Sequence, residues 1–118
     1  MGNLYVADVT GGSIYKFNPN GVRSTFASGL SYPYALAFDS AGNLFVTAWG
    51  NSGVAGYVYK YTSGGVRSTF AALGAPLGLA FDSSGNLLVM DEYSGNIYKF
   101  TPGGVRTVFA RTPFAWIR

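Results

Sequence analysis

The sequence contains no cysteine and no histidine among its 118 residues. The absence of cysteine excludes disulfide bonds, thiolate nucleophiles and cysteine-ligated metals. The absence of histidine excludes Ser-His-Asp triads, imidazole general bases and histidine-ligated metals. The side chains of this sequence therefore exclude most hydrolase mechanisms. The compartment stays open, because a cysteine-free chain suits both reducing and oxidising environments.

Charge is also scarce, since charged residues make up 11% of the chain. The carboxylates are only Asp8, Asp39, Asp82, Asp91 and Glu92. Long apolar runs of about 18 residues, which a membrane-spanning helix needs, do not occur, and the N-terminus lacks the layout of a signal peptide. We therefore expect no membrane partner. With 48% hydrophobic and 17% aromatic residues, the chain has the material for one packed domain.

One sequence pattern occurs three times in the chain. Residues 2–6 (Gly-Asn-Leu-Tyr-Val) return in similar form at 42–46 and 85–89. A spacing of roughly 40 to 45 residues is typical of propeller blades. The pattern predicts architecture more directly than chemistry.

Each repeat divides into four short apolar runs separated by turn residues, as expected for antiparallel strands joined in a meander. The first run of a unit follows a proline, at 34–38 and 77–81, and the second occupies 4–7, 44–48 and 87–90. The third run is the Tyr-Lys stretch at 14–17, 58–61 and 97–100, and the fourth begins at Arg23, Arg67 and Arg106. Helical apolar spacing is not sustained anywhere.

The motif Pro-x-(Gly/Ala)-Leu-Ala-Phe-Asp-Ser-x-Gly-Asn-Leu, at 33–44 and 76–87, resembles the blade consensus of NHL-type propellers and of the related gluconolactonase-like six-bladed propellers. The resemblance covers essentially the whole chain and implies an all-β fold of three four-stranded blades. It implies little about function, because such blades support binding modules and unrelated enzymes alike.

The repeat units are 2–38, 39–81 and 82–118 within a single domain, so the chain is cut inside a hairpin between the first and second strands of a blade. Three blades cannot close a ring, and both outer sheet faces would be bare. We predict a homodimer that forms a six-bladed propeller, in which the C-terminal strand of one copy completes a blade begun by the partner's N-terminus. The predicted closure residues are Leu4, Tyr5, Val6, Phe114, Ala115, Trp116 and Ile117. A fragment of a longer propeller, natural or engineered, is the alternative.

Two groups of residues are candidates for a site. Trp49, Asn51 and Tyr57 belong to an insertion in the second repeat, and Tyr93 lies in the equivalent loop of the third; together they could bind a sugar, a peptide or a nucleobase. Otherwise Trp49 packs against a neighbouring blade.

The second candidate group is acidic. Gluconolactonase-like propellers hold a divalent metal with Glu, Asn and Asp, and a weak calcium or magnesium site at Asp8, Asp91 and Glu92 is the closest counterpart here. Loop capping is the alternative for these three residues. Asp39 and Asp82 are predicted to cap their own turns.

The remaining repeated residues have predicted roles in packing or charge. Two aromatic rows are expected in the core between blades, namely Tyr15, Tyr59 and Tyr98, and Phe26, Phe70 and Phe109. Six repeated cations are either solvated or form a ring that attracts polyanions: Lys16, Lys60, Lys99, Arg23, Arg67 and Arg106.

These observations favour a non-catalytic binding or scaffold module without a cofactor, with itself as a partner and a small molecule or peptide as a possible ligand. A designed or laboratory-selected propeller with no natural ligand is also compatible with the sequence. The alternatives are a metal-dependent lactonase or esterase, and a polyanion-binding protein, with nucleic acid the less favoured polyanion. The lack of histidine argues against the virginiamycin B lyase type of propeller.

Overall fold

The computed structural model describes residues 2–49 and 56–111, which form eleven β-strands in three antiparallel sheets. The N-terminal sheet contains β1 (Leu4–Asp8), β2 (Ser13–Phe17) and β3 (Arg23–Ala27). The middle sheet contains β4 (Pro33–Phe38), β5 (Leu44–Ala48), β6 (Gly56–Tyr61) and β7 (Arg67–Leu73). The C-terminal sheet contains β8 (Pro76–Phe81), β9 (Leu87–Asp91), β10 (Asn96–Phe100) and β11 (Arg106–Arg111).

The predicted all-β meander is confirmed, because every predicted run in this part of the chain is a strand paired with its sequence neighbour. Four strands per unit are present in the middle and C-terminal sheets, whereas the N-terminal sheet has three among the described residues. The strand predicted at 113–118 lies outside those residues. A helix of membrane-spanning length and apolarity is not found in the described part.

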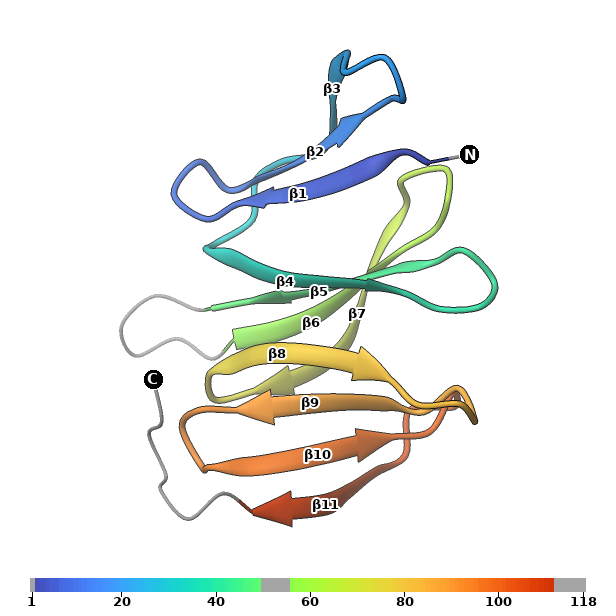
Figure 1. The fold of residues 1–118 in the computed structure, drawn as a ribbon. Helices are drawn as coiled ribbons and strands as arrows, with labels where there is room; N and C mark the ends of the chain where they lie inside the picture. Colours follow the sequence, from blue (N-terminus) through green and yellow to red (C-terminus); the bar gives the residue numbers. More distant parts are fainter. Residues whose placement is uncertain (1, 50–55, 112–118) are drawn as a thin grey trace.

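The three sheets follow one another in chain order (Figure 1). We call the face of a sheet that is turned toward the preceding sheet its front face, and the opposite one its rear face. The rear face of the N-terminal sheet packs on the front face of the middle sheet, through Ile14 against Leu44 and Val46. The rear face of the middle sheet packs in the same way on the C-terminal sheet, through Val58 against Leu87 and Val89. The core therefore consists of two equivalent apolar layers between sheets.

The aromatic rows are less buried than predicted. Tyr15, Tyr59 and Tyr98 are half-buried, and an arginine guanidinium lies over each ring at 4.6 to 4.8 Å from the ring centre. Phe26 and Phe70 are half-buried between sheets, but Phe109 is 58% exposed, because a following sheet is not present among the described residues. Tyr59 and Tyr98 nevertheless pack against the two core clusters between sheets, as do Phe26 and Phe70, so the expectation holds for these four residues. It is wrong for Phe109, and Tyr15 is not part of either cluster.

Two edges of the structure differ in the kind of loops they carry (Figure 1). The hairpin rim contains the turns at 18–22, 39–43, 62–66, 82–86 and 101–105, on the right in Figure 1. The inter-sheet rim, on the left, contains residues 9–12 and 92–95, Trp49, and the connections between sheets at 28–32 and 74–75. This division decides which side chains can act together.

Candidate functional site

The predicted binding residues are only partly brought together. Trp49 and Tyr93 are exposed on the inter-sheet rim, in the middle and C-terminal sheets respectively. Tyr57 lies within β6, where it is half-buried and stacks on Tyr59 with 5.6 Å between ring centres. Asn51 lies outside the described residues. Tyr57 therefore has a packing role, while Trp49 and Tyr93 remain candidates for binding.

Sequence reasoning missed two further exposed aromatic residues on the same rim as Trp49. Tyr32 is 45% exposed and Tyr34 is 56% exposed, and both flank Pro33 at the start of β4. The backbone N–H of Trp49 donates a hydrogen bond to the carbonyl oxygen of Tyr32 over 3.1 Å. We call Tyr32, Tyr34 and Trp49 the aromatic rim cluster. The cluster could have been found by comparing the repeats, because the third repeat has no aromatic residue at these three positions. It has Ala75, Leu77 and Glu92 there.

The backbone of Tyr32 is in an unusual conformation. Its φ of 49° is the one positive value at a non-glycine residue in the described segments. An L-residue in this region costs roughly 1 to 2 kcal/mol, because its Cβ approaches the following carbonyl oxygen. A residue before proline also normally adopts an extended conformation. Backbone strain of this kind is concentrated at functional sites.

A buried hydroxyl fixes the backbone next to Tyr34. The Oγ1 of Thr47 accepts a hydrogen bond from the Ala35 N–H at 3.0 Å and donates one to the carbonyl oxygen of Leu77 at 2.6 Å. Thr47 is fully buried. The pairing of β4 with β5 is irregular between Pro33 and Leu36, so the Ala35 N–H takes its partner from a side chain. Thr47 thus holds β4 to the neighbouring strand β8.

Two of the three predicted acidic residues, Asp8 and Asp91, cap loops with their carboxylates. Asp91 is buried and accepts hydrogen bonds from the Ala75 N–H at 2.7 Å and from the Ser94 hydroxyl at 2.8 Å. Asp8 accepts one from the Gly11 N–H at 3.0 Å. Glu92 is also buried, and its backbone N–H donates to the Ala75 carbonyl oxygen at 2.8 Å.

These carboxylates do not fit a divalent metal. Asp8 is in the N-terminal sheet, whereas Asp91 and Glu92 are at the end of β9 in the C-terminal sheet. Within the described part of the chain, three or more acidic side chains do not meet anywhere in a group that could hold a metal ion. Calcium needs six to eight oxygen ligands and magnesium an octahedral set, so the donors within one chain are too few, and the carboxylates of Asp8 and Asp91 already accept hydrogen bonds from their own loops.

The hairpin rim carries the turn-capping aspartates that the sequence predicted. Asp39 accepts hydrogen bonds from the N–H groups of Ala41 and Asn43, at 2.9 and 2.8 Å, and from the side-chain amide of Asn43 at 3.0 Å. Burial opposes the ionisation of Asp39, but these hydrogen bonds and the charge of Lys60 outweigh it and lower its pKa. Asp82 caps its own turn in the same way, and the hydrogen bonds that it accepts from the backbone and side chain of Asn86 lower its pKa.

The six repeated cations also lie toward the hairpin rim. The lysines are close to the ends of β2, β6 and β10, and the arginines begin β3, β7 and β11, which places all of them beside the turns at 18–22, 62–66 and 101–105. Only Asp39 and Asp82, among the carboxylates, lie on that rim. The hairpin rim is therefore basic, and the aromatic rim cluster lies at the opposite edge.

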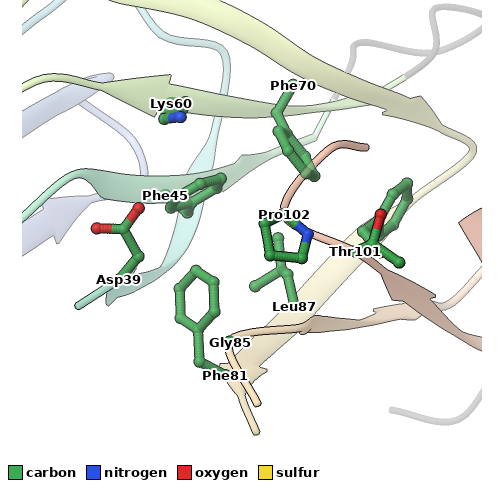
Figure 2. Close-up of a pocket in the computed structure, with 10 residues that line it drawn as sticks. Asp39, Phe45, Lys60, Phe70, Phe81, Gly85, Leu87, Thr101 and Pro102 are labelled. Atoms are coloured by element: carbon green, nitrogen blue, oxygen red, sulfur yellow. The ribbon is translucent and has the colours of Figure 1, made fainter. Parts of the chain in front are cut away.

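A small cavity opens between the middle and C-terminal sheets at the hairpin rim (Figure 2). Its volume is about 90 Å³, and Asp39 and Lys60 face aromatic walls that include Phe45, Phe70 and Phe81. The Lys60 ammonium lies 5.6 Å from the centre of the Phe45 ring. Ligand pockets usually measure about 300 to 1,000 Å³, so this cavity holds only a few water molecules.

Comparisons with known proteins agree with this geometry. A family model described as "Beta-propeller repeat" matches residues 24–54. The strands at 33–38 and 44–48, with the turn between them, lie inside the match. The fold is a β-propeller. The resemblance to propeller repeats is thereby supported, and each sheet is a blade.

Solved structures show the same fold at low sequence identity. The chain is similar to virginiamycin B lyase from Staphylococcus aureus, with a TM-score of 0.75 and 17% identity over 96% of this chain and 39% of that one. A streptogramin B lyase structure gives a TM-score of 0.77 and 16% identity, over 95% and 38% of the two chains. A structure described as a putative gluconolactonase gives a TM-score of 0.65 and 23% identity, over 86% of this chain and 35% of that one.

The chain therefore spans about two fifths of the length of the lyases it resembles. At these identities the likeness shows the propeller fold alone. A comparison of this chain with curated proteins found no match.

Proposed function

We propose that this chain is a non-catalytic propeller module that binds a ligand on its inter-sheet rim and closes into a six-bladed ring with a second copy of itself. The observation that supports closure is a difference in exposure between equivalent residues of the three sheets. Leu4, Leu44 and Leu87 occupy the same position on the front faces, yet their exposed fractions are 61%, 1% and 1%. Only the front face of the N-terminal sheet has its leucine in solvent.

The rear faces show the complementary difference. Phe26 and Phe70 contact aromatic residues of the next sheet, at 5.8 Å from Tyr61 and 5.5 Å from Phe100 between ring centres. Phe109, at the equivalent position of the C-terminal sheet, is exposed. The rear face of the C-terminal sheet thus exposes a phenylalanine at the position where the other two rear faces contact the next sheet.

A second copy supplies the face that each open surface lacks. The C-terminal sheet of one copy would pack on the N-terminal sheet of the other, and a two-fold axis would repeat that contact to close the ring. Burying each large apolar side chain contributes roughly 1.5 to 3 kcal/mol. The closure residues Phe114, Ala115, Trp116 and Ile117 lie outside the described residues, so the argument rests on Leu4, Val6 and Phe109.

Light scattering on a sizing column, over a dilution series, tests this closure. A mass of twice 12.5 kDa supports the proposal. A well-folded monomer overturns it. Polydisperse aggregate also overturns it and favours instead a longer propeller whose other blades cover the open faces.

The non-catalytic part of the proposal rests on the carboxylates. The acidic residues that could serve a hydrolase are capping loops and turns, as Asp91 and Asp39 illustrate. One of the similar lyases is a variant described as catalytically inactive after replacement of a histidine by alanine, and this chain has no histidine.

The competing proposal is a metal-dependent lactonase or esterase, in line with the similarity to a putative gluconolactonase. It predicts hydrolysis of lactones or aryl esters that stops on chelation, together with a lower unfolding temperature. Activity with added calcium or magnesium would overturn the non-catalytic proposal. Equal unfolding temperatures with and without chelator, and no turnover, support it.

A second candidate function is binding of an anionic polymer, and the observation that favours it is the placement of all six repeated cations at the hairpin rim. Lys16, Lys60 and Lys99 are close enough to the arginines of the adjacent strands to present one basic edge. Such binding weakens steeply with salt. Failure to be retained on a heparin column at low salt would eliminate this candidate.

A further inference from the structure

The geometry points to a neutral carbohydrate as the ligand class of the aromatic rim cluster, formed by Tyr32, Tyr34 and Trp49. The inference rests on the proposed function only in placing the ligand on the inter-sheet rim. A pyranose ring has an apolar face of C–H groups that stacks on aromatic rings, and an edge of hydroxyls that hydrogen-bonds to Tyr O–H and Trp N–H groups. Tyrosine and tryptophan side chains each combine a large apolar surface with a polar tip.

The aromatic rim cluster departs from the repeat. Three large aromatic side chains occupy positions at which the C-terminal sheet has Ala75, Leu77 and Glu92. The exposed fractions of Tyr32, Tyr34 and Trp49 are 45%, 56% and 39%, so each side chain leaves a large part of its surface in solvent. Residues that the fold does not require, and that are left in solvent, are available to a ligand.

The backbone that carries the cluster is held by hydrogen bonds. Trp49 and Tyr32 continue the strand register that pairs Pro33 with Ala48, and the hydrogen bond from Trp49 to Tyr32 joins them. Thr47 holds the segment after Tyr34. A ligand that stacks on side chains of a fixed backbone loses less free energy to ordering of the site.

Charged side chains lie outside the aromatic rim cluster. The six repeated cations lie at the hairpin rim. On the inter-sheet rim, Asp91 is buried and accepts three hydrogen bonds, and Glu92 is also buried. Asp8 and Arg111 end strands at this rim in the N-terminal and C-terminal sheets, not in the middle sheet that carries the cluster. The members of the cluster carry no charge themselves. An anionic or cationic ligand would find no partner among the three, whereas a neutral polyol would.

An extended peptide is less favoured because it would bind by adding a strand to β4. The Ala35 N–H, which such a strand would need, already donates to Thr47. Stacking on side chains therefore suits the cluster better than strand addition.

The experiment is titration of the intact chain against a panel of neutral gluco-, manno-, galacto- and xylo-oligosaccharides of α and β linkage, followed by calorimetry. A proline-rich peptide and an acidic oligosaccharide are titrated alongside. We expect saturable binding of at least one neutral oligosaccharide, with an affinity that is unchanged between low and high salt. In Trp49→Ala and in Tyr34→Ala the affinity should fall at least tenfold, whereas Trp49→Phe should keep most of it.

Val66→Ala is the matched control, because Val66 is an exposed apolar residue at the hairpin rim. Its affinity should equal that of the wild type, and circular dichroism should show the same fold in all variants. Absence of binding across the neutral panel, binding of the peptide or acidic sugar alone, or binding that survives Trp49→Ala would each overturn the inference.

Product analysis of the same mixtures separates this inference from the proposed function. A bound oligosaccharide that remains intact supports both. An oligosaccharide that is bound at the cluster and cleaved would overturn the non-catalytic proposal and leave the ligand class standing. Light scattering reports on ring closure independently of either result.

Discussion

The hydroxyl of Thr47 connects two blades, because it donates to the carbonyl oxygen of Leu77 over 2.6 Å while accepting the Ala35 N–H over 3.0 Å. Leu77 is in β8 and Ala35 in β4. The equivalent positions in the other two sheets are Ala7 and Met90, so this connection occurs once among the three sheets. It lies directly beneath the aromatic rim cluster.

Replacing Thr47 with valine should therefore destabilise the chain. The side chain keeps nearly the same shape, but a partly buried N–H and a partly buried carbonyl oxygen lose a partner, at about 1 to 2 kcal/mol for each group. We expect the free energy of unfolding in urea to fall by about 2 to 4 kcal/mol at fixed protein concentration. Thr69→Val is the control, because Thr69 is exposed on β7. Equal stability of the two variants would show that the Thr47 hydroxyl does not link the blades.

Tyr32→Gly should not destabilise the fold, and should stabilise it by up to about 1 kcal/mol, because glycine adopts positive φ without a Cβ clash. Tyr34→Gly is the matched comparison, since Tyr34 is in β4 and a glycine inside a strand costs roughly 0.5 to 1 kcal/mol. Thermal and urea unfolding measure both variants. A loss for Tyr32→Gly as large as that for Tyr34→Gly would contradict the strained conformation of Tyr32.

Leu4→Asp should disrupt assembly without unfolding the blades. An aspartate on the open front face would be buried against the partner at a cost of several kcal/mol, but it would be solvated in a free monomer. We expect the mass from light scattering to fall from dimer to monomer, and Phe109→Asp to have the same effect from the other side of the contact.

Val66→Asp is the control for the assembly test, because Val66 is exposed at the hairpin rim, away from both open faces. It should leave the mass unchanged. If Leu4→Asp and Phe109→Asp remain dimeric, the two open faces do not form the contact between copies.

Stability should depend on acidic pH through the two turn-capping aspartates. The hydrogen bonds to Asp82 from Asn86, and those to Asp39 from Asn43, lower the pKa of each carboxyl below its unfolded value of about 3.9. A lowered pKa in the folded state means that the stabilisation is complete above the unfolded value and is lost as pH falls through the folded value.

We expect the urea midpoint of the wild type to decline between about pH 5 and pH 2. In an Asp39→Asn, Asp82→Asn double variant the decline should be smaller, because neither turn then carries a carboxyl that gains a proton. Measurements at pH 7 give the cost of the substitutions themselves. An equal decline in both proteins would mean that other groups control acid unfolding.

The strands could be predicted from sequence because their determinants are local. Prolines 33 and 76 begin strands, and the Asp-Ser-x-Gly-Asn turns place glycine where positive φ is required, at 88° for Gly42 and 83° for Gly85. The repeat then supplied three readings of one pattern, which made each strand easier to locate. The turn-capping roles of Asp39 and Asp82 follow from the same local chemistry.

The candidate site was harder to predict, because proximity along a rim depends on how strands pair. Tyr57 belongs to the same insertion as Trp49, yet it lies in β6 and stacks on Tyr59. Tyr32 is 17 residues before Trp49 in the chain and is joined to it by a hydrogen bond. Asp91 and Asp8 are repeat-equivalent, but each faces its own loop.

The sequence by itself thus determined the strands, their order and the repeat, because hydrophobic alternation, prolines and turn residues act within a few positions of the chain. Only the tertiary structure decided which repeated side chains are buried. Leu4 and Leu44 are the same residue in the same local pattern, and one is exposed while the other is enclosed. Burial depends on which sheet packs against a face, and that neighbour is set by the stacking of whole sheets.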